Sequence, residues 1–234
     1  MPVSAQNLSQ LLSNSPDFPG RISPATAAEM LHRGVIRRFA RGGLVTHRST
    51  GQPRLCIVLS GTVRLTAFFP DGREMLLVII GPGDCWGVHP CLGNFHETND
   101  GMAETEAEIL LLEANVVRDL MWENRELQEA LIAVLCTRLN LAVQAATLYG
   151  VFNARQRVAW RLLLMSRWTP QNHQNFQANL TLSQETLGAI SQLSRQRINT
   201  ILKGYEAEGI ISLHYGGLII LKPEKLHEIM GDII

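Results

Sequence analysis

Side chains able to hydrogen-bond to the edges of DNA bases are gathered in one short stretch of the chain, residues 194–203. Apolar residues at positions 198, 201 and 202 follow helical spacing, so the polar side chains between them point away from the core. An exposed Arg pairs with guanine in the major groove, and Gln or Asn pairs with adenine. A merely solvated polar face is the simpler alternative. The residues that we expect to contact DNA are Ser183, Gln184, Ser194, Arg195, Gln196, Arg197, Asn199, Thr200 and Lys203.

Two short helices separated by a turn must position these side chains. Leu187 and Ile190 form the apolar stripe of the first helix, and Ser183 and Ser194 are suitable N-caps for the two helices. Gly188 lies inside the first helix, where it costs stability relative to Ala, and we expect it to make room for the second helix crossing close above it. Two helices crossing over a short turn form a helix-turn-helix.

Two β-rich runs follow the second helix, at 210–213 and 218–221, around the turn residues 214–217. This pattern predicts a hairpin. A helix-turn-helix with a hairpin is a winged module, and this combination favours DNA binding over a solvated face.

The stretch 183–211 resembles the winged helix-turn-helix of the Crp–Fnr transcription regulators, relatives of the cyclic-AMP receptor protein. The family usually has Gly in the turn, where this chain has Gln192; that residue then needs a left-handed backbone, at some energetic cost. The matching residues are Ser183-Gln184-Glu185, Leu187-Gly188, Ile190, Ser194-Arg195-Gln196, Ile198, Ile201-Leu202-Lys203 and Glu208-Gly209-Ile210-Ile211.

Short strands with regular turns occupy residues 35–112 and predict a sandwich or roll. Within it, 62–69 and 74–80 should pair as a hairpin around a turn at 70–73. Their order resembles the cyclic-nucleotide-binding roll of the same family, through Leu59-Ser60-Gly61-Thr62-Val63, Asp71-Gly72-Arg73-Glu74, Gly81-Pro82-Gly83-Asp84 and Gly87. The resemblance covers about residues 30–222 and implies an α+β protein: an N-terminal antiparallel β-roll, a long dimerisation helix and a C-terminal winged helix-turn-helix.

The expected domains are an N-terminal arm or loose start at 1–20, the roll at 21–114, the short and long helices with a hinge at 115–152, and the DNA-binding domain at 153–234. A short helix is expected at 8–12, and Ser23 is expected to cap the next helix. The long helix should break at 150–153, and 169–179 should be a loop.

The long helix, expected at 126–149, has apolar residues on two sides. One side has alternating three- and four-residue steps and predicts a dimer seam through Leu127, Val134, Leu141 and Leu148. A second flank runs through Leu131, Leu135, Leu139, Ala142 and Ala146. One side should pack on the roll and the other on the same helix of a second subunit, although a wholly intramolecular core helix is the alternative.

The effector pocket departs from the pattern of the nucleotide-binding members. They hold the ribose and the cyclic phosphate with a Gly-Glu pair and an Arg-Ser pair, whereas here Gly87 precedes Val88, and Glu97 and Thr98 occupy the second pair. A carboxylate repels a phosphate. The segment 87–108 contains neither Arg nor Lys, so a shifted alignment does not restore the clamp. We expect no cyclic AMP binding in the family's usual way, with the pocket formed around Gly87, Val88, His89, Glu97 and Thr98.

A haem- or metal-dependent gas or redox sensor is the alternative reading of the same loop. Cys85, His89 and Cys91 are soft metal ligands and lie close together in the sequence. The segment 83–92 also resembles the haem loop of the family's carbon-monoxide-sensing branch, but Gly87 replaces the Cys of that loop. Cys85 filling a core position is the simpler explanation. The cofactor is therefore unknown.

The formal net charge of zero excludes a protein that binds nucleic acid through a basic surface extending over the whole chain. Residues 1–149 hold 12 basic and 15 acidic residues and residues 150–234 hold 9 and 6, so the helix-turn-helix lies in the positive part. We expect a cytoplasmic protein with reduced thiols and no membrane-spanning run, partnering palindromic double-stranded DNA, itself as a homodimer, and RNA polymerase. A cupin-like metalloenzyme is a remote alternative, since no catalytic constellation is visible and we expect no enzyme.

Overall fold

Two compact units form the computed structural model of the chain, Met1–Asn140 and Leu141–Ile234. The structure describes residues 3–15, 18, 22–48, 52–68, 74–93, 95–166 and 178–231, apart from the side chains of 147–149. The predicted turn at 70–73 and most of the predicted loop at 169–179 therefore lie outside the described residues.

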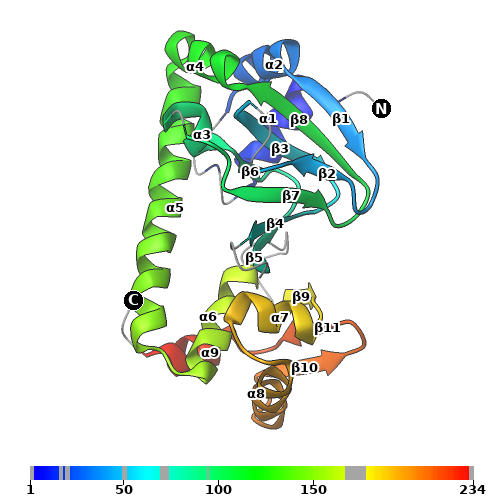
Figure 1. Ribbon diagram of the computed structural model, residues 1–234, viewed down its shortest axis with the longest axis vertical. Coiled ribbons are helices and arrows are strands. Elements are labelled where there is room, and N and C mark those ends of the chain that lie inside the picture. Colours follow the sequence, from blue (N-terminus) through cyan, green and yellow to red (C-terminus); the bar gives the residue numbers. More distant parts are fainter. Residues whose placement is uncertain are drawn as a thin grey trace. The chain divides into compact units, whose positions relative to one another are not determined.

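The first unit is a roll of two four-stranded antiparallel sheets (Figure 1), with strand orders β1-β8-β3-β6 and β2-β7-β4-β5. The predicted pairing of 62–69 with 74–80 is confirmed by the β4–β5 ladder. The strands are β1 (Val35–Phe39), β2 (Leu44–Thr46), β3 (Arg54–Ser60), β4 (Val63–Phe68), β5 (Glu74–Ile80), β6 (Cys85–Trp86), β7 (Asn99–Ala103) and β8 (Ala107–Glu113).

Strand β3 is buried on both faces, which explains its continuous apolar run. Leu55 and Ile57 belong to the core cluster that the helices cover, while Cys56 and Val58 belong to the cluster with Trp86. Successive side chains of a strand point to opposite faces, so a central strand covered on both sides must be apolar at every position.

The start of the chain is helical, with α1 spanning Ala5–Ser13. The predicted short helix is confirmed, but the expected loose start is wrong, because Leu8, Leu12 and Phe18 are buried in the core of the roll. Helix α2 (Pro24–Arg33) has Ser23 as its N-cap, as predicted. The other helices of the unit are α3 (Val88–Gly93), α4 (Ala114–Glu123) and α5 (Arg125–Val151), which continues into the second unit.

Three small elements around the pocket loop were not predicted: β6, α3 and β7. Strand β6 has only two residues, and β7 reads Asn-Asp-Gly-Met-Ala, without the β-branched residues that mark a strand. Their positions depend on pairing with distant strands, β3 for β6 and both β2 and β4 for β7.

The second unit contains α6 (Ala154–Ser166), α7 (Gln184–Ser191), α8 (Arg195–Ala207), α9 (Pro223–Met230) and the sheet β10-β11-β9. The hairpin is confirmed, with β10 at Ile211–His214 and β11 at Gly217–Ile220. Strand β9 (Ala178–Thr181) corrects the predicted loop at 169–179, whose last two residues are extended. Gly150 lies within α5, so the break between helices falls at Phe152 and Asn153.

Candidate DNA interface and effector region

The turn between α7 and α8 has the backbone conformation that the sequence required. Gln192 has φ 54° and ψ 46°, the left-handed region. It is the one non-glycine residue with positive φ in the described part of the chain. The predicted left-handed backbone at this position is therefore confirmed.

Both predicted N-caps are present at the helix-turn-helix. The Ser183 hydroxyl accepts a 3.0 Å hydrogen bond from the backbone N–H of Thr186, and the Ser194 hydroxyl accepts one of 3.3 Å from the N–H of Arg197. Each bond satisfies a donor of a first helical turn. These two serines thus orient the helices, whatever else they contact.

Gly188 is needed for space, but the crowding group is not the one predicted. A Cβ at Gly188 would lie 2.8 Å from the carbonyl oxygen of Leu193 in the turn, and 3.6 Å from Ile198 of α8. The turn, more than the second helix, therefore excludes a side chain at this position.

Helix α8 has one buried and one exposed face. Its buried side chains are Ile198, Ile201, Leu202 and Tyr205. Among the expected DNA contacts, Ser183, Ser194, Arg195, Gln196, Arg197, Thr200 and Lys203 are exposed, while Gln184 and Asn199 are half-buried.

Gln184 and Asn199 differ from the other expected contacts because they contact each other. The side-chain amide of Gln184 donates to the Asn199 side-chain oxygen at 3.4 Å, joining α7 to α8. Arg197 lines a hollow of about 250 Å³ together with Arg155 and Gly204. This position beside α6 distinguishes Arg197 from Arg195 and Gln196.

The wing ends in a two-residue turn at Tyr215 and Gly216, and Tyr215 is fully exposed. The imidazole of His214 lies 3.0 Å from the Asn179 side-chain oxygen on β9, which ties the tip to the third strand. Tyr215 is a further candidate contact that was not predicted, although an aromatic residue at the tip of a predicted hairpin could have indicated it.

Gly87 in the roll cannot be replaced without moving backbone. Its φ is +85°, and a Cβ there would lie 1.9 Å from the carbonyl oxygen of Arg54. The next residue, Val88, is fully buried at the start of α3. An apolar side chain inside the protein thus occupies the position expected for a ribose-binding carboxylate.

Glu97 places an acid next to this glycine. Its Oε1 atom has no solvent contact and no hydrogen-bond partner in the described part of the chain, and it lies 3.5 Å from a Cβ built on Gly87. Burial raises the pKa of the Glu97 carboxyl to about 7, although the nearby Arg138 acts to lower it. Thr98 is exposed.

Arg138 of α5 reaches the same region, which its position in the sequence, far from the pocket loop, does not reveal. Its guanidinium donates to the carbonyl oxygen of Cys85 and lies 3.8 Å from the Cys85 sulfur. Burial, with a contribution from Arg138, lowers the pKa of His89. The segment 87–108 has no cation of its own, but a helix from elsewhere in the chain supplies one.

The three weak metal candidates are not arranged as a metal site. Cys85 and Cys91 are buried, whereas His89 is exposed. Burial, together with the charge of Glu97, raises the pKa of the Cys91 thiol to about 12, which disfavours the thiolate that binds metals. Within the described residues, no three His, Cys, Asp or Glu side chains are grouped to hold a metal ion.

Comparison with known proteins matches both units. Residues 36–124 match the cyclic nucleotide-binding domain, and residues 156–229 match the Crp-like helix-turn-helix domain. The CRP-like cAMP-activated global transcriptional regulator of Mycobacterium tuberculosis is 27% identical over 220 residues, which cover 94% of this chain and 98% of that protein. The cyclic AMP receptor protein of Thermus thermophilus is 26% identical, over 93% of this chain and 98% of its own length.

The chain belongs to the Crp–Fnr family of transcription regulators. A solved structure of a CooA variant from Carboxydothermus hydrogenoformans has the same fold, with a TM-score of 0.74 at 21% identity over 94% of this chain and 95% of that one. This Crp–Fnr protein is a Crp-like transcription regulator with a DNA-binding helix-turn-helix. The family consists of regulators and not of enzymes, and regulators with this module bind DNA and act as dimers.

The dimer seam predicted for this Crp–Fnr protein is wrong at two positions. Leu127 and Val134 are 0% exposed, and both lie in the core cluster of their own roll. Leu141 is half-buried, and the side chain of Leu148 lies outside the described residues. The predicted apolar stripe is present, but Leu127 and Val134 pack inside the roll. Both sides of α5 are apolar, and periodicity alone does not tell which side faces its own domain.

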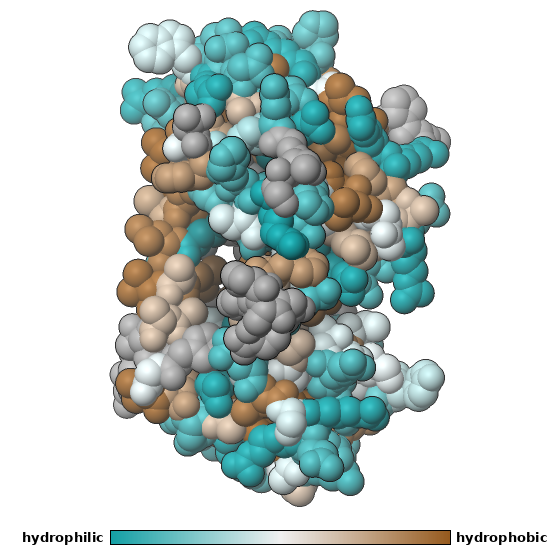
Figure 2. Space-filling model, in the orientation of Figure 1, coloured by the Kyte–Doolittle hydropathy of each residue, from teal (hydrophilic) through white to brown (hydrophobic). Residues whose placement is uncertain are grey.

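The opposite side of α5 carries an exposed apolar stripe. Its members are spaced by four and three residues in alternation, as in a coiled coil. Ile132 is 49% exposed, Leu139 66% and Val143 56%. Figure 2 shows apolar side chains gathered along the α5 edge of the molecule. We call this set the outer stripe: Ile132, Cys136, Leu139, Val143 and Ala146.

Helix α5 is apolar on both sides, and its residues Arg125–Ala146 are long and apolar enough to cross a bilayer by length and composition alone. The expectation that the chain has no apolar run of this length is therefore wrong. Core helices of soluble proteins can have such a run too, and here the inner side packs in the core of the roll.

Proposed function

We propose that this Crp–Fnr protein is a homodimer that reads a palindromic DNA site through α8 and does not take cyclic AMP through the family's clamp. The observation that carries the DNA-reading part is the exposed face of α8. Arg195 and Gln196 lie in its first turn, over a buried spine that includes Ile198 and Leu202. They are the side-chain types that discriminate bases in the major groove.

The outer stripe supplies the dimer contact. An exposed apolar seam is stabilised when it is covered, and a parallel copy of α5 matches its spacing. A two-fold dimer presents two α8 helices to successive major grooves about 34 Å apart. The operator is then an inverted repeat whose half-sites are about one helical turn apart.

The contacts divide into reading and positioning roles. Arg195 pairs with a guanine, and Gln196 selects at an adjacent base pair. Arg197, placed toward α6, and Lys203, farther along α8, bind phosphate, which fixes register without reading sequence. Tyr215 at the wing tip adds a contact to the sugar-phosphate backbone.

The residues of α7 and the two caps complete this interface. Ser183 and Ser194 orient helix N-termini whose free N–H groups suit phosphate. Gln184 holds Asn199 in place. Thr200 lies on the exposed face beside them.

The roll takes an effector other than cyclic AMP, or none. The proposal is supported by the burial of Val88 and of the Glu97 carboxyl oxygen. By the sequence resemblance, these residues are expected at the positions of the family's ribose-binding acid and phosphate-binding Arg. Calorimetry with cyclic AMP should show no heat of binding at micromolar concentrations. Micromolar binding that is lost in Thr98→Ala contradicts this part of the proposal.

The same assignment implies a cytoplasmic protein that contacts RNA polymerase at its promoters, with the outer stripe covered by a second subunit and not by lipid. The experiment for the DNA-reading part is selection of sites from a random DNA pool with the wild-type protein. We expect an inverted repeat with half-site centres about 10 base pairs apart. Recovery of no motif above background overturns the proposed function.

A further inference from the structure

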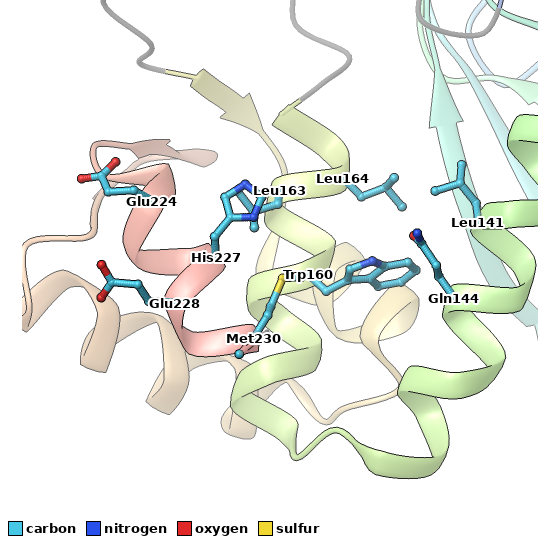
Figure 3. Close-up of a pocket in the computed structure, with 10 residues that line it drawn as sticks. Leu141, Gln144, Trp160, Leu163, Leu164, Glu224, His227, Glu228 and Met230 are labelled. Carbon is cyan, nitrogen blue, oxygen red and sulfur yellow. The ribbon is translucent and has the colours of Figure 1, made fainter. Parts of the chain in front are cut away.

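Two hollows border α6 in the second unit. The larger, of about 510 Å³, lies between α6, α5 and α9, and in Figure 3 its Trp160 and Leu164 face Leu141. None of the residues described around it belongs to α8. The smaller, of about 250 Å³, borders the recognition helix, which lines it with Arg197, Thr200, Ile201 and Gly204. This smaller hollow leaves one side of α8 open beside Thr200.

Thr200 belongs to a row of α8 residues that are four positions apart, Gln196, Thr200 and Gly204. Residues at this spacing are neighbours on one face of a helix. Gln196 and Thr200 are both exposed. One helical turn rises about 5.4 Å and one base pair about 3.4 Å, so Thr200 lies within about two base pairs of any pair that Gln196 contacts.

The Thr200 hydroxyl is already engaged within the helix. It donates a 3.1 Å hydrogen bond to the backbone carbonyl oxygen of Gln196, one turn back. Its single proton is therefore not free to donate to a base. The methyl group on the same carbon takes a different staggered position, away from that carbonyl, and is the part of the side chain that is offered to a ligand.

Gly204 keeps the same face open one turn farther along. A glycine inside a helix costs stability relative to Ala. In the described part of the chain, the one atom within 4 Å of a Cβ built on Gly204 is Nη1 of Arg155, at 3.9 Å. Crowding among the described residues therefore does not require a glycine here. The missing side chain leaves room for a second molecule to approach Thr200 closely.

We propose that Thr200 selects thymine, by contact of its methyl group with the thymine methyl group in the major groove, near the base pair that Gln196 reads. Thymine is the one DNA base that presents a methyl group there, and a Thr methyl group is a suitable apolar partner for it. This contact needs no hydrogen bond, which fits a side chain whose hydroxyl is bonded to its own helix. The inference rests on the proposed reading of DNA by α8 and adds a third reading residue to Arg195 and Gln196.

The test uses the full chain and the inverted repeat that it selects from a random DNA pool. The base pair under Gln196 is the one whose preference is lost in a selection with Gln196→Ala. Each thymine within about two base pairs of it is then replaced, in both half-sites, by deoxyuridine, which lacks only the methyl group. Fluorescence anisotropy measures the Kd. At one symmetric position, uracil should raise the Kd about four-fold for each half-site, the fold-change expected for one buried methyl group.

Two variants assign this effect to the Thr200 methyl group. Thr200→Ser keeps the hydroxyl and should bind the thymine and uracil sites equally, whereas Thr200→Val keeps the methyl group and should retain the preference for thymine. The inference is overturned, with DNA reading by α8 intact, by a selected motif without thymine in this interval. Equal binding of thymine and uracil by the wild type at every position, or a preference that persists in Thr200→Ser, overturns it in the same way. A pool that yields no motif overturns both the inference and the proposed function.

Discussion

The hydroxyl of Tyr205 donates a 2.6 Å hydrogen bond to the backbone carbonyl of Arg155. The bond joins the recognition helix α8 to the first turn of α6. The Arg155 guanidinium also lies over the Tyr205 ring, 4.9 Å from its centre, and donates a 2.5 Å hydrogen bond to Glu208. Burial raises the pKa of the Tyr205 phenol, so the hydroxyl remains a donor throughout the physiological range.

Tyr205→Phe should lower the free energy of unfolding of the second unit by about 1–2 kcal/mol, because it removes a buried hydrogen bond but keeps the ring. Chemical denaturation of the full chain measures the change. Tyr215→Phe is the matched control, since its hydroxyl belongs to an exposed side chain, and it should change stability by less than about 0.5 kcal/mol. If Tyr205→Phe and the wild type are equally stable, the Tyr205 hydroxyl does not anchor α8 to α6.

Leu139→Glu combined with Val143→Glu should convert the dimer to a folded monomer. The two substitutions place four like charges in a seam that the proposal covers with a second α5. Sedimentation or light scattering gives the mass, and circular dichroism shows that the fold is retained. A double variant that keeps the dimer mass rules out the outer stripe as the dimer contact.

Two matched variants separate this contact from general damage to α5. Asn140→Glu adds charge at an exposed position beside the stripe and should remain dimeric. Val134→Glu instead buries a charge in the roll and should unfold it. Cys136 supplies a second readout, because it is exposed in the single chain while Cys56, Cys85 and Cys91 are buried. Since the proposed dimer covers Cys136, its alkylation by a maleimide should be slow in the native protein and fast in the Leu139→Glu, Val143→Glu monomer.

Glu97→Gln should change how stability depends on pH. The folded-state pKa of Glu97 is about 7 against an ordinary value of 4.5, so the folded chain binds more protons between these values. Wild-type stability therefore falls, relative to the variant, as pH rises from about 4.5 to 7, by roughly 1–2 kcal/mol after allowance for solvent screening. Urea denaturation at pH 5 and pH 8 checks this; parallel profiles for the two proteins contradict it.

Local features of the sequence predicted local structure well. Ser183 and Ser194 cap the helices, and Gln192 takes the left-handed backbone, because each depends on neighbours within four residues. The β10–β11 hairpin could be predicted for the same reason, because its two runs flank a short turn. The family resemblance, based on ordered short motifs, is confirmed by matches to both units.

Features that depend on distant contacts could not be predicted. The two sides of α5 are both apolar, so the sequence did not show that Val134 packs inside and Leu139 outside. Arg138 is 41 residues from Glu97 in the chain, and only the folded roll brings its charge near that carboxyl. Strand β9 has only four residues and forms because it pairs with β11, so its own sequence does not indicate a strand.

The most direct test of DNA reading by α8 is selection of sites from a random pool with Arg195→Ala and Arg197→Ala. Arg195→Ala should lose preference at one symmetric position, at a cost of about 1–3 kcal/mol for the preferred base. Arg197→Ala should keep the wild-type motif, weaken all sequences alike and lower the salt slope by about one. If Arg195→Ala selects the wild-type motif at every position, Arg195 does not read DNA and α8 docks differently from the proposal.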